Sequence, residues 1–422
     1  MVFPEFMRKN LVSGRISDIS DITCTFFGKN SVSELTINQK LEALCVSMNI
    51  SVEDLDTIIS SHQEVSRTVK GHAFELIFDD VMSINGIVSE EVGGDSDVDR
   101  IVNSYSLQLK TPFIKGCDEI KNIISYKTHK THGSKSESES MDYYHKVSDF
   151  ADFLVGLVSY EPFHLLIIPK NSLPRVKKDN SYIEDPMYFS TKNNPYIDNY
   201  SQLGINTSIS IPDGFFSLSD NELLPISSKM FDIKSKYLIN TIFLSENFRI
   251  WDMNMRGFIR EHVFNKALKA HNIKPISPTS LNIERSNKCD FILRRKDGSI
   301  CRFQMKGLTF KGCKLRGINS IIDCETQLSR GHVNDHPTQS RLYLETDFDY
   351  LIIAVDPSYT NALSIECFNV PKYKWKYYCL PVQKLSRHSN WSHRINSHQY
   401  IKYTDLQQYA IKPDWINQFI TD

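Results

Sequence analysis

The sequence lacks any long apolar stretch of the kind that crosses a membrane. Its longest apolar runs, residues 153–158 and 350–355, are far shorter than the roughly 20 residues that a spanning helix needs. Residues 1–14 mix charged and apolar side chains, without the apolar centre of a secretory signal. We therefore expect a cytoplasmic protein that has no membrane partner.

The chain also lacks paired cysteines. It has nine cysteines, an odd number, and none of them forms a Cys-x-x-Cys pair. This pattern excludes a disulfide framework and gives no zinc-site spacing. We expect the cysteines to be small buried residues in a reducing compartment.

Neither sign of charge is in excess. The 49 Lys and Arg residues are balanced by 50 Asp and Glu residues, so the formal net charge is −1. This balanced net charge does not indicate a nucleic-acid partner. It does not exclude one either, because basic residues can gather on one face. The composition, 41% hydrophobic and 23% charged, argues against disorder, and 422 residues suit two domains better than one.

What the sequence does contain is an internal repeat. Residues 70–78 and 256–264 both follow the pattern basic-Gly-x-x-x-Glu-x-aliphatic-Phe. Residues 108–117, QLKTPFIKGC, match residues 304–313, QMKGLTFKGC, at five of ten positions. Unrelated stretches would share about one position at ordinary residue frequencies. The repeat therefore indicates a duplication.

Four weaker matches follow in the same order along the chain. They pair residues 148–154 with 346–351, 168–170 with 370–372, 173–174 with 380–381, and 196–197 with 400–401. We predict two related domains fused head to tail. The expected ranges are 1–207, with a helical part at 1–69 and a core at 70–170, and 208–422, with a core at 256–371.

Each repeat reads as a helix followed by strands. Apolar residues recur at helical spacing after Phe74, and apolar and polar residues alternate over residues 105–110 and 300–306. The apolar runs at 153–158 and 350–355 are typical of strands buried on both faces. We predict an α/β (α+β) protein in which each repeat is a central mixed sheet flanked by helices, with helical and loop additions.

Two corresponding sets of polar residues lie on these elements. The sets are Glu75, Asp97, Gln108 and Lys110, and Glu261, Asp290, Gln304 and Lys306. Period two places the Gln and the Lys of each set on one face of a strand. Carboxylate and carbonyl oxygens suit a hard cation such as Mg²⁺, and a neighbouring Lys can stabilise charge that develops on a phosphate.

This arrangement resembles the PD-(D/E)XK nuclease superfamily, and within it the type II restriction endonucleases. There an Asp and a Glu-x-Lys pair form the metal site, often with a Glu from the first core helix. The resemblance implies two fused copies of that fold and Mg²⁺ as the cofactor. The catalytic residues that it implies are Asp97, Gln108, Lys110, Asp290, Gln304 and Lys306. The metal ligands that it implies are Glu75, Asp97, Glu261 and Asp290.

The chain departs from the family pattern at two places. Ser96 and Cys289 stand where the family has a Pro before the Asp. Gln replaces the second acidic residue in both copies, which removes one negative charge and makes metal binding depend more on the helix Glu. In the first copy the metal ligand is Asp97 or one of its neighbours, Asp95 and Asp99, and the sequence does not decide between them.

Other features bear on DNA. Lys115 and Lys311 follow the two strands at the same spacing, and we expect them near the phosphate backbone, although a plain turn lysine fits equally well. The loops at 118–147 and 314–345 differ between the copies and are rich in Lys, Arg, His, Asn and Gln, the residues that read base edges. Ordinary loop drift explains the difference equally well.

The leading hypothesis is a Mg²⁺-dependent hydrolase, a site-specific endonuclease of restriction–modification type that cuts double-stranded DNA. Two fused copies would let a monomer act as a pseudo-dimer with one site for each strand, and a homo-oligomer stays possible. The alternatives are a nicking or repair nuclease with one inactive repeat, and a duplex DNA-binding protein without catalysis.

Overall fold

A computed structural model of the full chain gives the fold of most of its residues. The described ranges are 35–48, 50–92, 98–128, 144–243, 245–276, 289–308, 320–327, 342–355 and 375–419. They form a mixed α/β structure that contains several separate sheets. No helix in these ranges is both long enough and apolar enough to cross a membrane.

The chain divides into two compact units. The first unit is Ile59–Phe248, and the second is Arg249–Asp422 together with Met1–Ile58. The division differs from the expected boundary after residue 207. Residues 208–248 join the first repeat, and the helical additions before residue 58 join the second repeat.

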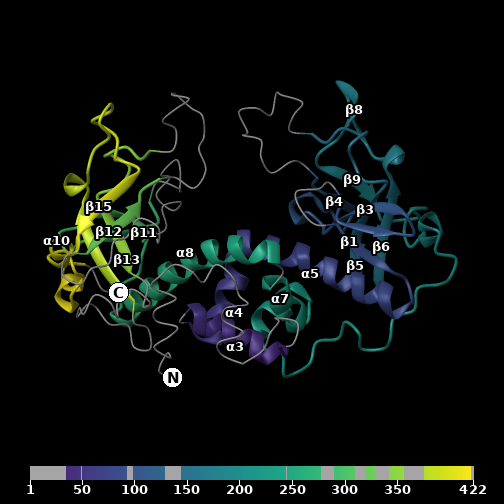
Figure 1. The fold of residues 1–422 in the computed structure, drawn as a ribbon, viewed down its shortest axis with the longest axis horizontal. Helices are drawn as coiled ribbons and strands as arrows, with labels where there is room; N and C mark the ends of the chain where they lie inside the picture. Colours follow the sequence, from purple (N-terminus) through teal and green to yellow (C-terminus); the bar gives the residue numbers. More distant parts are fainter. Residues whose placement is uncertain are drawn as a thin grey trace. The chain divides into compact units, whose positions relative to one another are not determined.

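The first unit is built on a five-stranded sheet in the order β1-β2-β3-β5-β6. The strands are β1 (Ser89–Glu91), β2 (Arg100–Val102), β3 (Tyr105–Lys110), β5 (Phe153–Tyr160) and β6 (Phe163–Pro169). Only the β3–β5 pair is parallel. Helix α5 (Gln63–Ile84), labelled in Figure 1, contacts β1 and β3. The predicted helix, alternating strand and buried strand of this repeat are confirmed.

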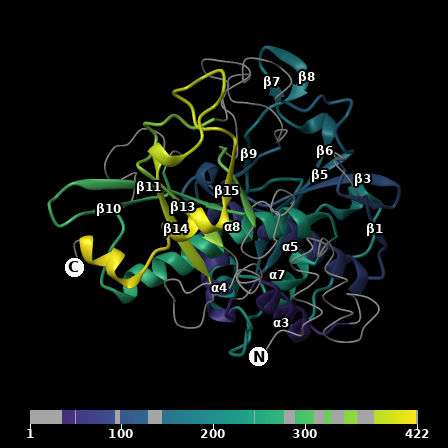
Figure 2. The same cartoon turned by 60° about the vertical axis from the view of Figure 1, so that its left-hand side comes forward.

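The second unit has a four-stranded sheet in the order β10-β11-β13-β14. The strands are β10 (Phe291–Arg294), β11 (Ile300–Gly307), β13 (Tyr350–Val355) and β14 (Lys376–Pro381). Again only the central pair, β11–β13, is parallel. Figure 2 labels the four strands of this sheet. Helix α8 (Ser245–Ala270) covers the sheet through Phe264, whose ring contacts those of Phe291 and Tyr377.

The strand registers support the duplication. Gln108 lies opposite Leu154 in the first unit, and Gln304 lies opposite Leu351 in the second. An Asp just before the central strand repeats as well. The Ser106 N–H donates to Asp152 Oδ2 at 3.0 Å, and the Arg302 N–H donates to Asp349 Oδ2 at 2.8 Å. The two copies therefore share local hydrogen bonds in addition to sequence.

The registers also correct one of the weak sequence matches. Pro169 pairs with Phe153 at the end of β6, and Pro381 pairs with Tyr350 at the end of β14. Pro169 therefore corresponds to Pro381, and the predicted match of residues 173–174 with 380–381 is wrong. The same correspondence rules out the predicted match of residues 168–170 with 370–372, and residues 370–372 lie outside the described ranges.

A second small sheet in each repeat was not predicted. Strand β4 (Ile123–Tyr126) pairs with β9 (Met187–Ser190), and β12 (Ile321–Glu325) pairs with β15 (His398–Lys402), both antiparallel. The segments 118–147 and 314–345 therefore contain a strand each and are not only loops. Most of their remaining residues, 129–143 and 328–341, lie outside the described ranges.

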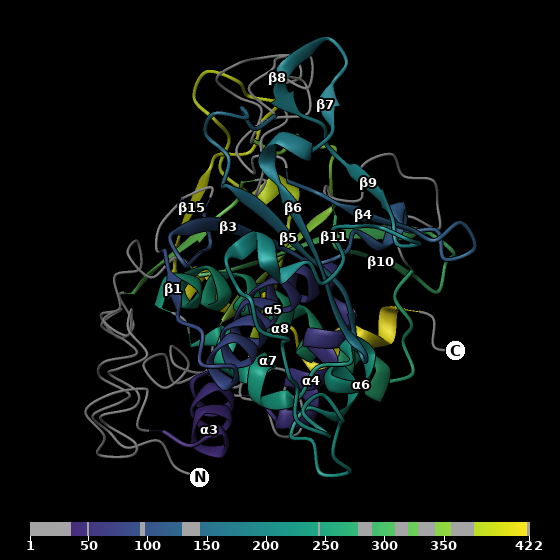
Figure 3. The same ribbon diagram turned by 90° about the vertical axis from the view of Figure 1, so that its right-hand side faces the viewer.

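The remaining elements are short additions to the two units. They are α3 (Ile37–Met48), α4 (Val52–Ser61), β7 (Arg175–Val176), β8 (Asp179–Ile183), α6 (Pro225–Phe231), α7 (Ser235–Ile242) and α10 (Tyr403–Gln407). Figure 3 shows β7 and β8, which pair as a hairpin in the first unit. Ser51 caps the N-terminus of α4, since the Asp54 N–H donates to Ser51 Oγ at 3.2 Å.

Candidate functional site

The second repeat gathers its predicted residues at one end of strand β11. Asp290 directly precedes β10, and its Oδ2 accepts the Met305 N–H at 2.6 Å and the Gln304 Nε2–H at 2.8 Å. The Asp290 N–H in turn donates to Phe303 O at 2.8 Å. The carboxylate is therefore held between two residues of the strand that carries Gln304 and Lys306. We call Glu261, Asp290, Gln304 and Lys306 the Glu261 site.

Glu261 faces this carboxylate from α8. Burial, followed by the charge of Asp290, raises the pKa of Glu261 to about 8. Burial also raises the pKa of Asp290, although the Met305 N–H opposes the shift. Two buried carboxyl groups this close do not ionise independently, because each charge disfavours the other. A bound cation would relieve that repulsion.

Lys306 completes the site from the same strand. Its Nζ donates to Gln327 O at 3.0 Å and lies 5.4 Å from the centre of the Tyr343 ring. Burial lowers the pKa of Lys306, while the charge of Asp290 opposes the shift. The ammonium group is therefore positioned by one carbonyl and one aromatic ring beside the two carboxylates.

In the first repeat, Asp99 occupies the place of Asp290. The Asp99 N–H donates to Leu107 O at 2.8 Å, and Asp99 Oδ2 accepts the Leu109 N–H at 2.7 Å. Lys110 Nζ lies 4.0 Å from the same oxygen. The predicted ligand Asp97, like Asp95, lies outside the described ranges. The structure brings together Glu75, Asp99, Gln108 and Lys110, which we call the Glu75 site.

Glu75 has partners that Glu261 lacks among the described residues. Its carboxylate lies 3.3 Å from Arg100 Nη1 and 3.2 Å from His72 Nδ1. Burial raises the pKa of Glu75, but the His72 hydrogen bond and the charges of His72, Arg100 and Lys110 outweigh it and leave the pKa lowered. Burial raises the pKa of Asp99 more than the Lys110 charge lowers it. Glu75 is therefore an ionised, paired side chain.

Both sites contain a buried oxygen that lacks a hydrogen bond. Gln108 Oε1 and Gln304 Oε1 are buried, and neither has a hydrogen-bond partner among the described residues. Such an unpaired acceptor is costly unless a cation or a donor reaches it. Each site thus offers two carboxylates and one amide oxygen.

These oxygen donors are of the kind that binds Mg²⁺, but they are few. Mg²⁺ takes oxygen ligands, and it commonly keeps several waters while one or two carboxylates and substrate phosphates complete its shell. Within the described ranges, no group of three or more His, Cys, Asp or Glu side chains could hold a metal ion. The protein donors alone would therefore fill only part of the coordination shell.

The two predicted backbone-binding lysines are not placed alike. Lys115 lies in a 3₁₀ turn, Ile114–Gly116, and is exposed. Gly116 is needed there because a Cβ would meet Ser125 Oγ at 2.7 Å. Lys311 lies outside the described ranges. The exposed position of Lys115 agrees with a contact to DNA and equally with a plain turn.

Two arginines beside the sites were not predicted. Arg100 is almost fully buried and joins Glu75 to Asp79, whose Oδ2 lies 2.9 Å from Arg100 Nη2. Arg260 precedes Glu261, and its charge acts on Glu261, Asp290 and Lys306. Neither arginine is shared by the two repeats, so comparing the repeats for identical residues does not find them. Both lie next to a residue of a candidate site, and that position is the only sequence signal for them.

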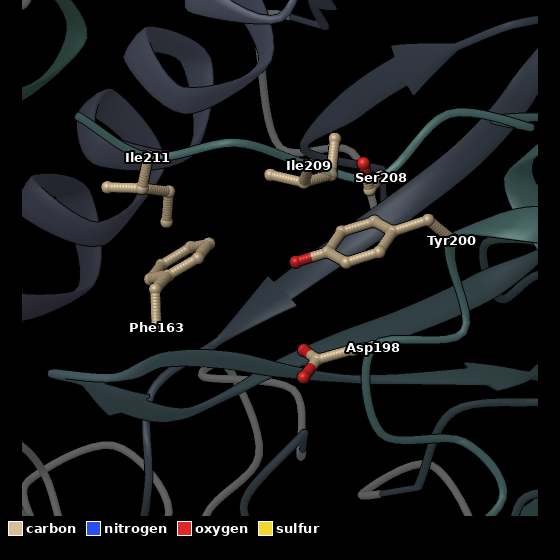
Figure 4. A pocket seen from close by; sticks show the side chains of 6 residues that line it. All are labelled: Phe163, Asp198, Tyr200, Ser208, Ile209 and Ile211. Carbon is tan, nitrogen blue, oxygen red and sulfur yellow. The ribbon is translucent and has the colours of Figure 1, made fainter.

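A separate pocket lies at the far edge of the first sheet. Its volume is about 230 Å³, and it is lined by Phe163, Asp198, Tyr200, Ser208, Ile209 and Ile211. Figure 4 shows the isoleucines across the pocket from Asp198. Asp198 is held by His164, whose Nδ1 lies 2.5 Å from its Oδ2. None of the predicted site residues lines this pocket, so it is not part of the Glu75 site.

We compared the chain with family models, curated proteins and solved structures. No family model, curated protein or solved structure matches this chain. What the chain does is therefore argued from the two sites themselves.

Proposed function

We propose that the protein is a Mg²⁺-dependent endonuclease that cuts double-stranded DNA, of the restriction type, with one site in each repeat. Each repeat would then be a domain of PD-(D/E)XK kind. The observation that carries the proposal is that the same arrangement is built twice. In both copies the charge of a helix Glu acts on an Asp whose carboxylate accepts the backbone N–H between a Gln and a Lys.

The chemistry follows from these groups. When bound, Mg²⁺ would polarise a phosphodiester and lower the pKa of a bound water. The carboxylates and the unpaired Gln oxygen supply the ligands, and Lys110 or Lys306 supplies positive charge for the oxygens that become more negative during hydrolysis.

Strand-resolved digestion tests the proposal. Supercoiled plasmid and Mg²⁺ are incubated with the wild type, Lys110→Ala, Lys306→Ala and the control Lys269→Ala, and the fragment ends are sequenced. We expect discrete linear fragments from the wild type and from the control, whose lysine is exposed at the end of α8. Each site variant should nick one defined strand, with the other strand slowed by up to about 1,000-fold.

The other outcomes separate the alternatives. DNA binding without any Mg²⁺-dependent cleavage would reject the nuclease and favour a DNA-binding protein. Failure to bind DNA would reject both. Cleavage of both strands at the wild-type rate by both lysine variants would show that the chemistry lies elsewhere in the chain.

A nicking enzyme with one working site is the second candidate, and a specific difference favours it. Glu75 is already paired with Arg100 and His72, whereas Glu261 has no ion-pair partner within the described ranges. On this candidate the Glu261 site cuts alone. Open circles would then be the product of the wild type, and Lys110→Ala would leave the rate unchanged.

A further inference from the structure

Arg260 occupies a space that the chain leaves open for it. A Cβ at Gly307, the residue after Lys306, would overlap Nη1 of Arg260. A Cβ at Gly257, one turn earlier on α8, would meet Nη2 at 3.3 Å. The guanidinium group is therefore enclosed between a helix glycine and a strand glycine. We call Gly257 and Gly307 the glycine cradle.

The backbone that carries Arg260 is anchored as well. The Tyr377 hydroxyl on β14 donates to Arg260 O at 3.0 Å. The side chain, by contrast, has no hydrogen bond or ion pair with any residue that the structure describes, and its Nε is buried without a partner. An arginine that is positioned but unpaired, beside Glu261 and Lys306, has unused donors for an anion.

The first repeat has no equivalent of this arrangement. The position of Arg260 is taken by Phe74, which is fully buried, and that of Gly307 by Thr111. At Gly71, which corresponds to Gly257, an added Cβ would have nothing within 4 Å. The glycine cradle therefore belongs to the Glu261 site alone.

We propose that Arg260 binds the phosphate that is cut at the Glu261 site, and that the Glu75 site works without such a group. The inference rests on the proposed nuclease function and deepens it. A guanidinium group presents a planar fork of N–H donors that matches two phosphate oxygens, which a lysine ammonium does not. Lys306 and Arg260 would then approach the phosphate as two cations from different elements.

The cradle provides a test that does not remove the charge. The variants are Arg260→Ala, Arg260→Lys, Gly307→Ala, the double variant Arg260→Ala/Gly307→Ala, and the matched control Gly71→Ala. The Ala methyl at Gly307 displaces the guanidinium, because the flexible side chain moves more easily than backbone. Both single changes should then give the same defect, and the double variant should be no worse than either.

Cleavage, the salt dependence of DNA binding, Ca²⁺ affinity and the melting temperature are measured on each variant. Cleavage of an end-labelled duplex containing the sequenced cut site should fall about 100-fold on one strand only in Arg260→Ala, Gly307→Ala and the double variant, and should be unchanged in Gly71→Ala. The slope of log affinity against log salt for a 30-base-pair duplex without metal should fall by about one. Ca²⁺ affinity should be unchanged or tighter, because a positive charge beside the carboxylates has been removed or displaced. Arg260→Lys should recover part of the binding but little of the rate.

The outcomes that overturn the inference differ from those that overturn the nuclease. If the wild type does not cut DNA, the proposed function fails, and the salt slope still decides whether Arg260 contacts phosphate. If the wild type cuts and Arg260→Ala slows neither strand, or slows both equally, Arg260 is not the phosphate ligand of one site. Weaker Ca²⁺ binding together with a lower melting temperature would show a structural role instead.

Discussion

The two sites share a backbone arrangement, but the pKa of the helix glutamate is shifted in opposite directions in the two. In the Glu75 site a buried Arg100 pairs with Glu75 and Asp79, and the pKa of Glu75 is lowered. In the Glu261 site no arginine pairs with the glutamate among the described residues, and the pKa of Glu261 is raised. Shared geometry therefore does not imply equal chemistry, because each site is tuned by a residue that the other one lacks.

Two positions explain this difference, the residue after the aspartate and the residue before the glutamate. Each holds an arginine in one copy and a phenylalanine in the other. Arg100 follows Asp99, whereas Phe291 follows Asp290 and packs against Phe264 and Phe303. The helix position before the glutamate is Phe74 in one copy and Arg260 in the other. Each copy thus has one arginine next to its carboxylates, but it comes from the strand in the first copy and from the helix in the second.

The largest effect is expected from Arg100→Met in the first unit. Removing the guanidinium leaves Asp79 without its ion-pair partner and leaves Glu75 with His72 alone, and breaking a buried ion pair in this way costs about 3–5 kcal/mol. Urea denaturation should show this loss in the unit that contains Glu75. The matched change at the corresponding position, Phe291→Met, removes no charge and should cost less. Equal losses would mean that packing, and not ion pairing, sets the stability at this position.

Metal binding should depend on pH more strongly at the Glu261 site than at the Glu75 site. Asp99→Asn leaves the Glu261 site intact, and Asp290→Asn leaves the Glu75 site intact. A cation at the Glu261 site must displace a proton below pH 8, because the pKa of Glu261 is raised to about 8. Calorimetry should therefore show Mg²⁺ affinity falling about 100-fold from pH 8 to pH 6 in Asp99→Asn.

The Glu75 site provides the contrast in that measurement. Glu75 keeps a lowered pKa and stays ionised over this range, whereas the pKa of Asp99 is raised without reaching that of Glu261. Asp290→Asn should therefore show a smaller change of Mg²⁺ affinity than Asp99→Asn. The number of protons released, measured in buffers of different ionisation enthalpy, checks the cause. Proton release from Asp290→Asn but not from Asp99→Asn would reverse the assignment.

Much of the scaffold could be predicted from the sequence because its signals are local. Alternation over residues 105–110 and 300–306 located β3 and β11, and the apolar run at 350–355 matches β13. Strands β4 and β12 were missed because each has four or five residues and pairs with a strand more than 60 residues further along the chain. Pairing over such separations leaves no periodic mark in either segment.

The sequence predicted the residues of the candidate sites except for the aspartate of the Glu75 site. Residues 95–99 are Asp-Ser-Asp-Val-Asp, so any of three carboxylates could be the predicted metal ligand. The choice depends on register, since Asp99 is the residue whose N–H reaches Leu107 O and whose carboxylate reaches the Leu109 N–H. The pairing of Arg100 with Asp79 spans 21 residues and two elements, and no spacing rule would have predicted it.

The smallest expected difference comes from restoring an acid at the glutamine positions. Gln304→Glu loses the amide N–H that donates to Asp290 Oδ2 at 2.8 Å and adds a like charge, so we expect a loss of about 1–2 kcal/mol without metal. Gln108 makes no such bond with a described residue, so Gln108→Glu should cost less. Thermal melts in EDTA measure both, and saturating Mg²⁺ should recover most of either loss because a third carboxylate then binds the cation. A loss in Gln108→Glu as large as in Gln304→Glu would mean that added charge, rather than the broken hydrogen bond, limits the stability of both sites.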